Sequence, residues 1–332
     1  MLINGNLILG STILKRTGTK ATITYNLTNC ISTNTAVNVS KNGTYTTTLV
    51  ADTSFSYVGV RIIMGTKDIT SNCYNMSTGV VNITNVDGNI TITAEKLTTF
   101  SNASWYAIKN VAQNNFASTL GWVIGDTKPL IIGDYSYTVR ICDLTEHRYQ
   151  YYNDATRYSN MVLETVELFP ETKQRSTSDN GNYNGNTIRQ FYLNNLISLM
   201  DVSCSSLLET VKIPNYYMTN NSTSQTNFSN DKIFTPGSTA TGRDTNYEDE
   251  TVYQYYSENG VSARLKKAVN GTSAIVWWIR TGGWSNPPYT GGYSGSVGQY
   301  INTDGSFSSL IETDFQSART INQYGVPIFW AW

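Results

Sequence analysis

The sequence predicts two folded parts in series, an all-β sandwich over residues 18–97 and an α+β domain over residues 98–332. Residues 18–97 are short runs of alternating apolar and polar residues separated by turn residues, which is typical of a small sandwich. After residue 98, helical spacing is mixed with strand-like runs. The length of 332 residues also exceeds the ~100–200 residues of a typical domain.

The composition excludes several classes of protein. Charged residues make up 14% of the chain and the net charge is −1, whereas a nucleic-acid-binding protein needs a basic surface to neutralise phosphates. His147 is the single histidine, which excludes a histidine-rich metal site. The chain has 35 Asn and 45 Thr, and its hydrophobic content of 39% is too high for a disordered chain. We therefore expect a folded protein with an uncharged polar surface.

No segment looks like a membrane anchor or a secretory signal. The most apolar run, 274–279, has six residues, whereas a membrane-spanning helix needs about 20. The first ten residues lack the basic flank and the long apolar stretch of a signal peptide. The cysteines form no Cys-x-x-Cys pair and are interpreted as reduced, mostly buried thiols: Cys30, Cys73, Cys142 and Cys204. We expect a protein made in a cytoplasm and not exported by the general secretory route.

The first part carries strand patterns and no candidate catalytic site. Residues 1–17 are interpreted as a first strand or as an arm that docks on a partner. Strands are predicted at 21–25, 44–50, 58–64, 79–84 and 89–93, with turns at Asn42-Gly43, Gly65 and Asp87-Gly88. Residues 39–49, 60–70 and 80–94 carry a resemblance to the small Ig-like β-sandwich modules of bacterial surface proteins and phage virion proteins. The resemblance implies an Ig-like fold and a spacer role.

The second part should contain helices as well as strands. A helix capped by Ser101-Asn102 is predicted from the spacing of Trp105, Ile108 and Phe116, and further helices at 186–200 and 252–267. Strands are predicted at 129–132, 137–142, 207–213, 232–234, 274–280 and 325–332, with a hairpin around 303–305. Residues 281–298 are interpreted as a loop rich in Gly, Ser and Tyr.

The second part also resembles an uncharacterised domain family of gut bacteria and their phages. Two of the motifs are Ala274-Ile-Val-Trp-Trp-Ile-Arg280 and Gly325-Val-Pro-Ile-Phe-Trp330, and the others are 121–126, 137–144, 186–195, 230–236 and 302–305. The resemblance implies a C-type-lectin-like fold, related to the ligand-displaying domains of variable phage receptor-binding proteins, and no agreed activity. The chain departs from the pattern by an insertion between Asn215 and Asn230. It also has Thr281-Gly-Gly-Trp284 where the family more often has a Ser-Pro.

Candidate catalytic and metal residues are weak. His147 has Asp143, Glu146 and Arg148 nearby, as a general base would need, but the segment is charged and follows a strand, so we favour a surface histidine. The acidic run 244–250 is either a calcium site or a hydrated loop, and it lacks the spacing of a calcium loop. A glycosidase carboxylate pair could be drawn from three residues: Glu164, Glu167 and Glu171. We predict no catalytic residue, no metal and no cofactor.

Aromatic residues in or beside polar loops are the stronger candidates for a binding site. Tyr combined with Ser, Gly and Asn is the composition of adaptable binding loops. The candidate ligand-binding residues are Tyr216, Tyr217, Trp284, Tyr289, Tyr293 and Tyr300. The alternative is that these rings pack on the core, as expected for Trp277, Trp278, Phe329 and Trp330.

These observations together favour a phage virion structural protein displayed on the particle surface. It would be made in the bacterial host cytoplasm and would sit on a tail fibre or baseplate tip, or on the capsid as a decoration or head-fibre protein. The N-terminal region would attach to other virion proteins, and the second part would bind host surface polysaccharide or protein, without nucleic acid or membrane contact. We expect a homo-oligomer or a symmetric array. The alternatives are a bacterial surface carbohydrate-binding adhesin and, less favoured, a polysaccharide-cleaving enzyme.

Overall fold

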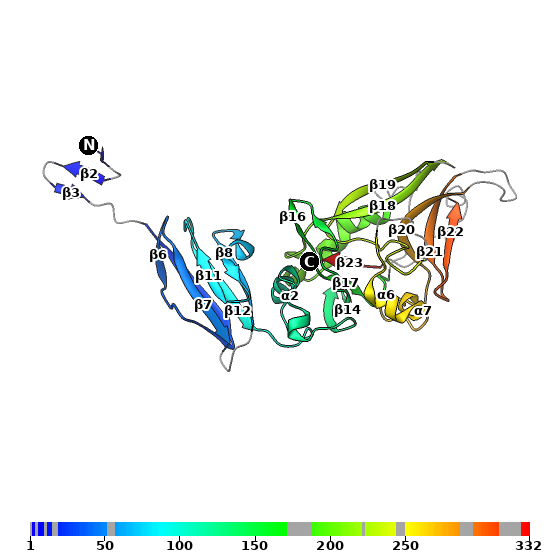
Figure 1. Ribbon diagram of the computed structural model, residues 1–332, viewed down its shortest axis with the longest axis horizontal. Coiled ribbons are helices and arrows are strands. Elements are labelled where there is room, and N and C mark those ends of the chain that lie inside the picture. The colour runs from blue at the N-terminus through cyan, green and yellow to red at the C-terminus, as the bar shows by residue number, and fades with distance from the viewer. Residues whose placement is uncertain are drawn as a thin grey trace. The chain divides into compact units, whose positions relative to one another are not determined.

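The computed structural model describes residues 2–3, 6–9, 12–14, 19–51, 57–170, 187–220, 223–243, 250–285, 295–311 and 327–332. Side chains are described within 19–51, 57–170, 189–216, 227–243, 250–281, 299–308 and 327–332. The chain forms two compact units, of which the first comprises Met1–Thr98 and Tyr106–Asn110 and the second comprises Thr99–Trp105 and Val111–Trp332 (Figure 1). Strands account for 42% of the structure and helices for 17%, so the protein is β-rich.

The first unit is a β-sandwich whose two sheets have strand orders β10-β11-β7-β5 and β6-β4-β12-β8-β9. The longer strands are β4 (Lys20–Thr28), β7 (Tyr45–Ala51), β8 (Val58–Met64), β11 (Val80–Ile83) and β12 (Ile90–Lys96). The shorter elements are β5 (Cys30–Ser32), β6 (Asn38–Ser40), β9 (Lys67–Asp68), β10 (Tyr74–Asn75) and the single helical turn α1 (Thr70–Cys73). All pairs are antiparallel except that β12 runs parallel to β4. Three further strands pair with one another as β1-β2-β3: β1 (Leu2–Ile3), β2 (Asn6–Leu9) and β3 (Thr12–Leu14).

The alternation in the sequence explains the sandwich core. In β7 and β12 every second residue is buried, so one face of each strand packs inward and the Thr-rich face meets solvent. Ile62 of β8 and Ile92 of β12 are directly paired and fully buried. The period-two alternation in the sequence therefore corresponds to strands whose apolar side chains face the core of the sandwich.

The second unit contains three sheets, with orders β13-β14-β17-β23, β16-β15-β18-β19 and β20-β21-β22. The first sheet consists of β13 (Thr127–Ile132), β14 (Tyr135–Asp143), β17 (Val162–Thr165) and the C-terminal β23 (Phe329–Ala331). The second consists of β15 (Gln150–Tyr151), β16 (Asp154–Tyr158), β18 (Val211–Asn220) and β19 (Thr223–Asp231). The third consists of β20 (Trp277–Ser285), β21 (Gly295–Ile301) and β22 (Phe307–Ile311), and β20 lies against β18.

The helices agree in position with the sequence patterns but are more broken than expected. The first is α2 (Trp105–Gln113), followed by the 3-10 turn η1 (Ser118–Leu120). The predicted helix 186–200 consists of α3 (Thr187–Phe191), the π-helical η3 (Tyr192–Leu196) and α4 (Ile197–Leu199), and α5 (Val202–Ser205) follows. The predicted helix 252–267 is split at Gly260, which has a φ of +53°, into α6 (Gln254–Asn259) and α7 (Val261–Arg264).

The structure corrects the prediction of loops in the two tyrosine-rich segments. Of the insertion expected between Asn215 and Asn230, residues 215–220 lie in β18 and residues 223–230 in β19, so Tyr216 and Tyr217 lie in a strand. Trp284 lies in β20 and Tyr300 in β21, within and beside the predicted loop 281–298, of which residues 286–294 lie outside the described residues. Thr and Tyr favour paired strands, and pairing satisfies their backbone groups. This preference outweighs the loop-like polarity of these segments.

Aromatic residues dominate the core of the second unit. Trp105, Trp330 and Trp332 form a cluster with ring centroids 6.1–6.2 Å apart, and the C-terminal Trp332 is fully buried. Trp277 and Trp278 are also fully buried. All four cysteines are free thiols, three of them buried. Among the described residues, no helix has the length and apolar character needed to cross a membrane.

Candidate functional site

A pocket of about 680 Å³ opens on one face of the sheet β16-β15-β18-β19. Its floor is formed by Lys212 and Pro214 of β18 and by their directly paired residues in β19, Asn230 and Phe228. Because side chains alternate between the two faces of a strand, Val211 and Ile213, on either side of Lys212, point to the other face and are buried in the core. The other lining residues are Thr145, Glu146, His147, Arg148, Tyr149, Gln150, Tyr152, Glu250 and Thr251.

Two aromatic rings at the pocket remain accessible to solvent. Tyr152 is 52% exposed and Phe228 is 58% exposed, although both line the pocket. An exposed ring offers a flat face for a ligand that has its own apolar face. The pocket therefore combines aromatic faces with hydrogen-bonding groups.

One wall of the pocket is the turn that precedes β15. His147 lies there with a φ of +57°, a conformation that His tolerates more readily than most residues. Its backbone N–H donates to Asn160 Oδ1 at 3.0 Å, and its exposed ring packs 5.3 Å from that of Tyr158. His147 is thus the surface histidine expected from the sequence, but it also lines the pocket.

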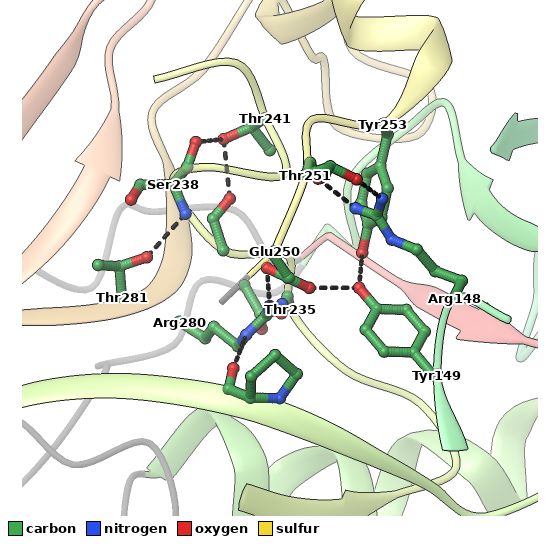
Figure 2. A network of polar contacts seen from close by, with 12 residues as sticks. Arg148, Tyr149, Thr235, Ser238, Thr241, Glu250, Thr251, Tyr253, Arg280 and Thr281 are labelled. Carbon is green, nitrogen blue, oxygen red and sulfur yellow. Dashed lines mark hydrogen bonds and ion pairs between the residues drawn. The ribbon is translucent and has the colours of Figure 1, made fainter. Parts of the chain in front are cut away.

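Arg148 joins this wall to the segment at Glu250–Thr251. Its guanidinium donates to the hydroxyl and carbonyl oxygens of Thr251 (Figure 2). The same group forms an ion pair with Asp143 at 3.3 Å. It also lies 4.6 Å from the ring centroid of Tyr253. These contacts engage both terminal nitrogens of the guanidinium, so Arg148 holds the wall against the segment at Glu250–Thr251.

Glu250 is held in place by Tyr149 and Arg280. Its carboxylate accepts a hydrogen bond from Tyr149 Oη and forms an ion pair with Arg280 (Figure 2). Arg280 also donates to the carbonyl oxygen of Pro214 at 2.8 Å and to that of Thr235 at 3.0 Å. Burial, together with the nearby carboxylate of Glu250, raises the pKa of Tyr149, so this phenol stays protonated as the donor. The Glu250–Arg280 pair therefore ties the wall to the floor strand β18.

A second cluster of buried charge lies away from the pocket. Glu164 of β17 is fully buried and pairs with Arg140 at 2.6 Å and with Lys266 at 2.8 Å, and it accepts from Tyr256 Oη at 2.9 Å. Burial would raise the pKa of Glu164, but the charges of Arg140 and Lys266 lower it below its usual value. Glu164 is thus a structural group whose two carboxylate oxygens are buried and paired, so it presents no accessible oxygen to a substrate as either member of a glycosidase pair would need to. Glu167 accepts from the N–H of Thr138 at 2.8 Å, and Glu171 lies outside the described residues.

Of the six predicted binding residues, Tyr216 and Tyr300 have described side chains, and neither lines the pocket. Tyr216 lies two residues after Pro214 in β18, so strand alternation places it on the same face of the sheet, beyond the lining residues. Tyr300 pairs with Trp278 and packs edge-on against it at 5.9 Å, so it contributes to packing. The side chains of Tyr217 and Trp284, and Tyr289 and Tyr293 entirely, lie outside the described residues.

Glu250 is the one described residue of the acidic run 244–250, and its carboxylate is buried against Arg280 and Tyr149 and not hydrated. Residues 244–249 lie outside the described residues. In the described part of the chain, no three or more His, Cys, Asp or Glu side chains gather as a metal site would require.

Sequence reasoning missed most of the pocket because its residues come from three separate segments: 145–152, 212–230 and 250–251. Two signals were available in the sequence. Lys212, Pro214 and Tyr216 alternate with Val211, Ile213 and Asn215, as in a strand with two different faces. Phe228 is an isolated aromatic residue in a polar stretch.

Residues 158–330, just over half of the chain, match the domain of unknown function DUF6273. The matched segment contains the pocket floor and Glu250, whereas residues 145–152 of the wall precede it. Its two ends lie together, since β17 pairs with β23, and β13 and β14 of the same sheet lie upstream of it. No curated protein and no solved structure matches the chain. The chain belongs to the DUF6273 family.

Proposed function

We propose that the second unit is a carbohydrate-binding domain whose ligand occupies the pocket on the sheet β16-β15-β18-β19. The observation that carries the proposal is the exposure of Tyr152 and Phe228 within a pocket whose other lining residues are mostly polar. Sugar rings present an apolar C–H face and a rim of hydroxyl groups. They are therefore matched by aromatic faces next to hydrogen-bond donors and acceptors.

The proposal also includes a C-type-lectin-like fold for this unit and an Ig-like fold for the first. The mixed helices and sheets of the second unit, and the pairing of its C-terminal β23 with β17, are compatible with such a self-contained domain. The two facing sheets of the first unit are compatible with an Ig-like module.

We further propose that the chain is a phage virion protein displayed on the particle surface, with the second unit binding host polysaccharide or protein. The first unit and residues 1–17 would attach it to other virion proteins, in a homo-oligomer or symmetric array. The support is the tandem of a sandwich with a pocket-bearing domain. Co-purification with phage particles and light scattering of the isolated chain test this context, and a monomer without affinity for particles contradicts it.

Binding to a glycan array tests the carbohydrate-binding function. Wild-type protein should bind a defined set of glycans, and Phe228→Ala and Tyr152→Ala should each weaken that binding about tenfold, as for hot-spot aromatics. The control is Tyr135→Ala, because Tyr135 is 36% exposed and does not line the pocket. Equal binding by all four proteins would place the ligand elsewhere, and no binding by wild type would contradict the function. Release of cut fragments from a bound polysaccharide would instead identify an enzyme.

A further inference from the structure

The charged groups of the pocket differ in whether the protein already neutralises them. Arg148 is paired with Asp143, and Glu250 is paired with Arg280. Lys212 contacts Gln150, whose Oε1 accepts from the Lys212 Nζ at 2.7 Å. Within the described residues Lys212 forms no ion pair, so its charge is met by a neutral amide alone.

A hydrogen bond to Gln150 fixes the position of the Lys212 ammonium group. Gln150 is itself fixed because its Nε2 donates to the carbonyl oxygen of Ala155 at 2.8 Å. An ammonium group has three donors, and this contact uses one of them, so two remain for a ligand. Lys212 is also half-buried on the pocket floor, where solvent screens its charge less than at the surface.

The residue opposite Lys212 adds a second donor. Asn230 is its direct partner in the β18–β19 register, and side chains of such pairs lie about 5 Å apart at Cβ. The next pair on the same face is Pro214 and Phe228. The floor thus presents a cation beside an amide, followed by an apolar and aromatic surface two residues along the strands.

We infer that the pocket selects acidic sugars, in which a carboxylate binds at Lys212 and Asn230 while the ring lies against Phe228. This inference rests on the proposed carbohydrate-binding function and names its ligand class. A charge-assisted hydrogen bond is about twice as strong as a neutral one, so the carboxylate supplies selectivity and the ring contact supplies general affinity.

One lining charge opposes this preference. Glu146 is exposed and accepts a hydrogen bond from Asn115 Nδ2, and its carboxylate would repel an anionic ligand. Because Glu146 is exposed, water and salt screen its charge more than they screen that of Lys212. Glu146→Gln should therefore strengthen binding of acidic sugars slightly, and Lys212→Met should weaken it strongly.

The test compares matched acidic and neutral sugars by calorimetry or ligand-observed NMR. Suitable pairs are methyl glucuronide with methyl glucoside and methyl galacturonide with methyl galactoside, and a methyl sialoside extends the acidic set. Wild type should prefer the acidic members at least about tenfold, and this preference should fall as salt is raised. Lys212→Met should remove the preference, so that the acidic and neutral members of each pair bind with equal affinity, and the control Lys232→Met, which changes an exposed lysine outside the pocket, should retain the preference.

The possible results separate the inference from the function on which it rests. Binding of neutral sugars with no acidic preference, or a preference that survives Lys212→Met, overturns the acidic selectivity and leaves carbohydrate binding intact. Failure of wild type to bind any sugar in this set or on the array contradicts both. Tryptophan fluorescence of each variant verifies that the second unit is folded, because all seven tryptophans belong to that unit.

Discussion

The two units are both β-rich but differ in what they bury. The described core of the first unit is mainly aliphatic, includes the fully buried Ile62 and Ile92, and has few buried polar side chains such as Thr47. The second unit buries complete charged groups, including Arg140, Glu164 and Lys266. Buried charge requires exact pairing to offset its desolvation, whereas apolar burial requires only a complementary shape. The core of the second unit therefore depends on specific charge pairing more than the core of the first unit does.

The largest expected effect is in the charged cluster of the second unit. Glu164→Ala leaves Arg140 and Lys266 buried without their counterion, which should lower the free energy of unfolding of this unit by about 3–5 kcal/mol. Denaturant unfolding followed by tryptophan fluorescence reports this unit specifically. Glu167→Ala, which removes one acceptor of the Thr138 N–H, should have a smaller effect. Equal effects of the two variants would contradict the role of the ion cluster.

The next effect tests the apolar core of the first unit. Ile92→Ala removes a fully buried side chain of β12 and should lower the free energy of unfolding by about 2–5 kcal/mol. Since the first unit contains no tryptophan, amide hydrogen exchange in β8 and β12 is the appropriate measurement. The control Thr93→Ala lies on the same strand and is only half-buried. A loss of tryptophan-detected stability as large as the loss in β12 would show that the two cores are not independent.

The same difference explains how far the sequence could be interpreted. Alternation and helical spacing depend on neighbours in sequence, so the sandwich strands and α2 could be predicted. The hairpin of β18 and β19 was missed because its Asn, Ser and Thr residues have the composition of a loop. The pocket and the Glu164 cluster were missed for another reason. The ion pair of Glu164 with Lys266 joins residues about 100 positions apart, and no local pattern encodes such a contact.

Acid should destabilise the second unit more than the first. The pKa of Glu164 is lower in the folded protein than in the unfolded chain, so on acidification the unfolded chain takes up a proton at a higher pH. The stabilisation by ionised Glu164 is therefore complete above the unfolded pKa of about 4.3 and is lost as the pH falls through the lower pKa of the folded state. Three more carboxyls of this unit have a lowered pKa because Ser or Thr donates to them: Asp154, Asp201 and Asp304. Asp231, whose pKa burial raises, acts in the opposite direction.

In the first unit, Asp68 also has a lowered pKa, where the donors at Thr70 and Arg61 outweigh its burial. Thermal unfolding between pH 7 and pH 3 should therefore show a steeper loss in the tryptophan signal than in exchange protection of β12. Asp201→Asn should flatten the pH dependence of the second unit, because it removes one of these titrating groups. Parallel pH profiles for the two units would contradict this expectation.

The smallest expected effect comes from an exposed ion pair of the first unit, which has the same chemical groups as a buried pair of the second. Arg61 and Asp68 form a pair at 3.1 Å in the first unit, where their side chains are 34% and 38% exposed, whereas the Arg140–Glu164 pair of the second unit is buried. Water screens the exposed pair and already solvates each partner when the other is removed, so Arg61→Ala should change stability by no more than about 1 kcal/mol. Hydrogen exchange of β8 measures it, and added salt should reduce the effect further. A loss in free energy of unfolding as large as that of Glu164→Ala would contradict the expectation that an ion pair matters more when it is buried than when it is exposed.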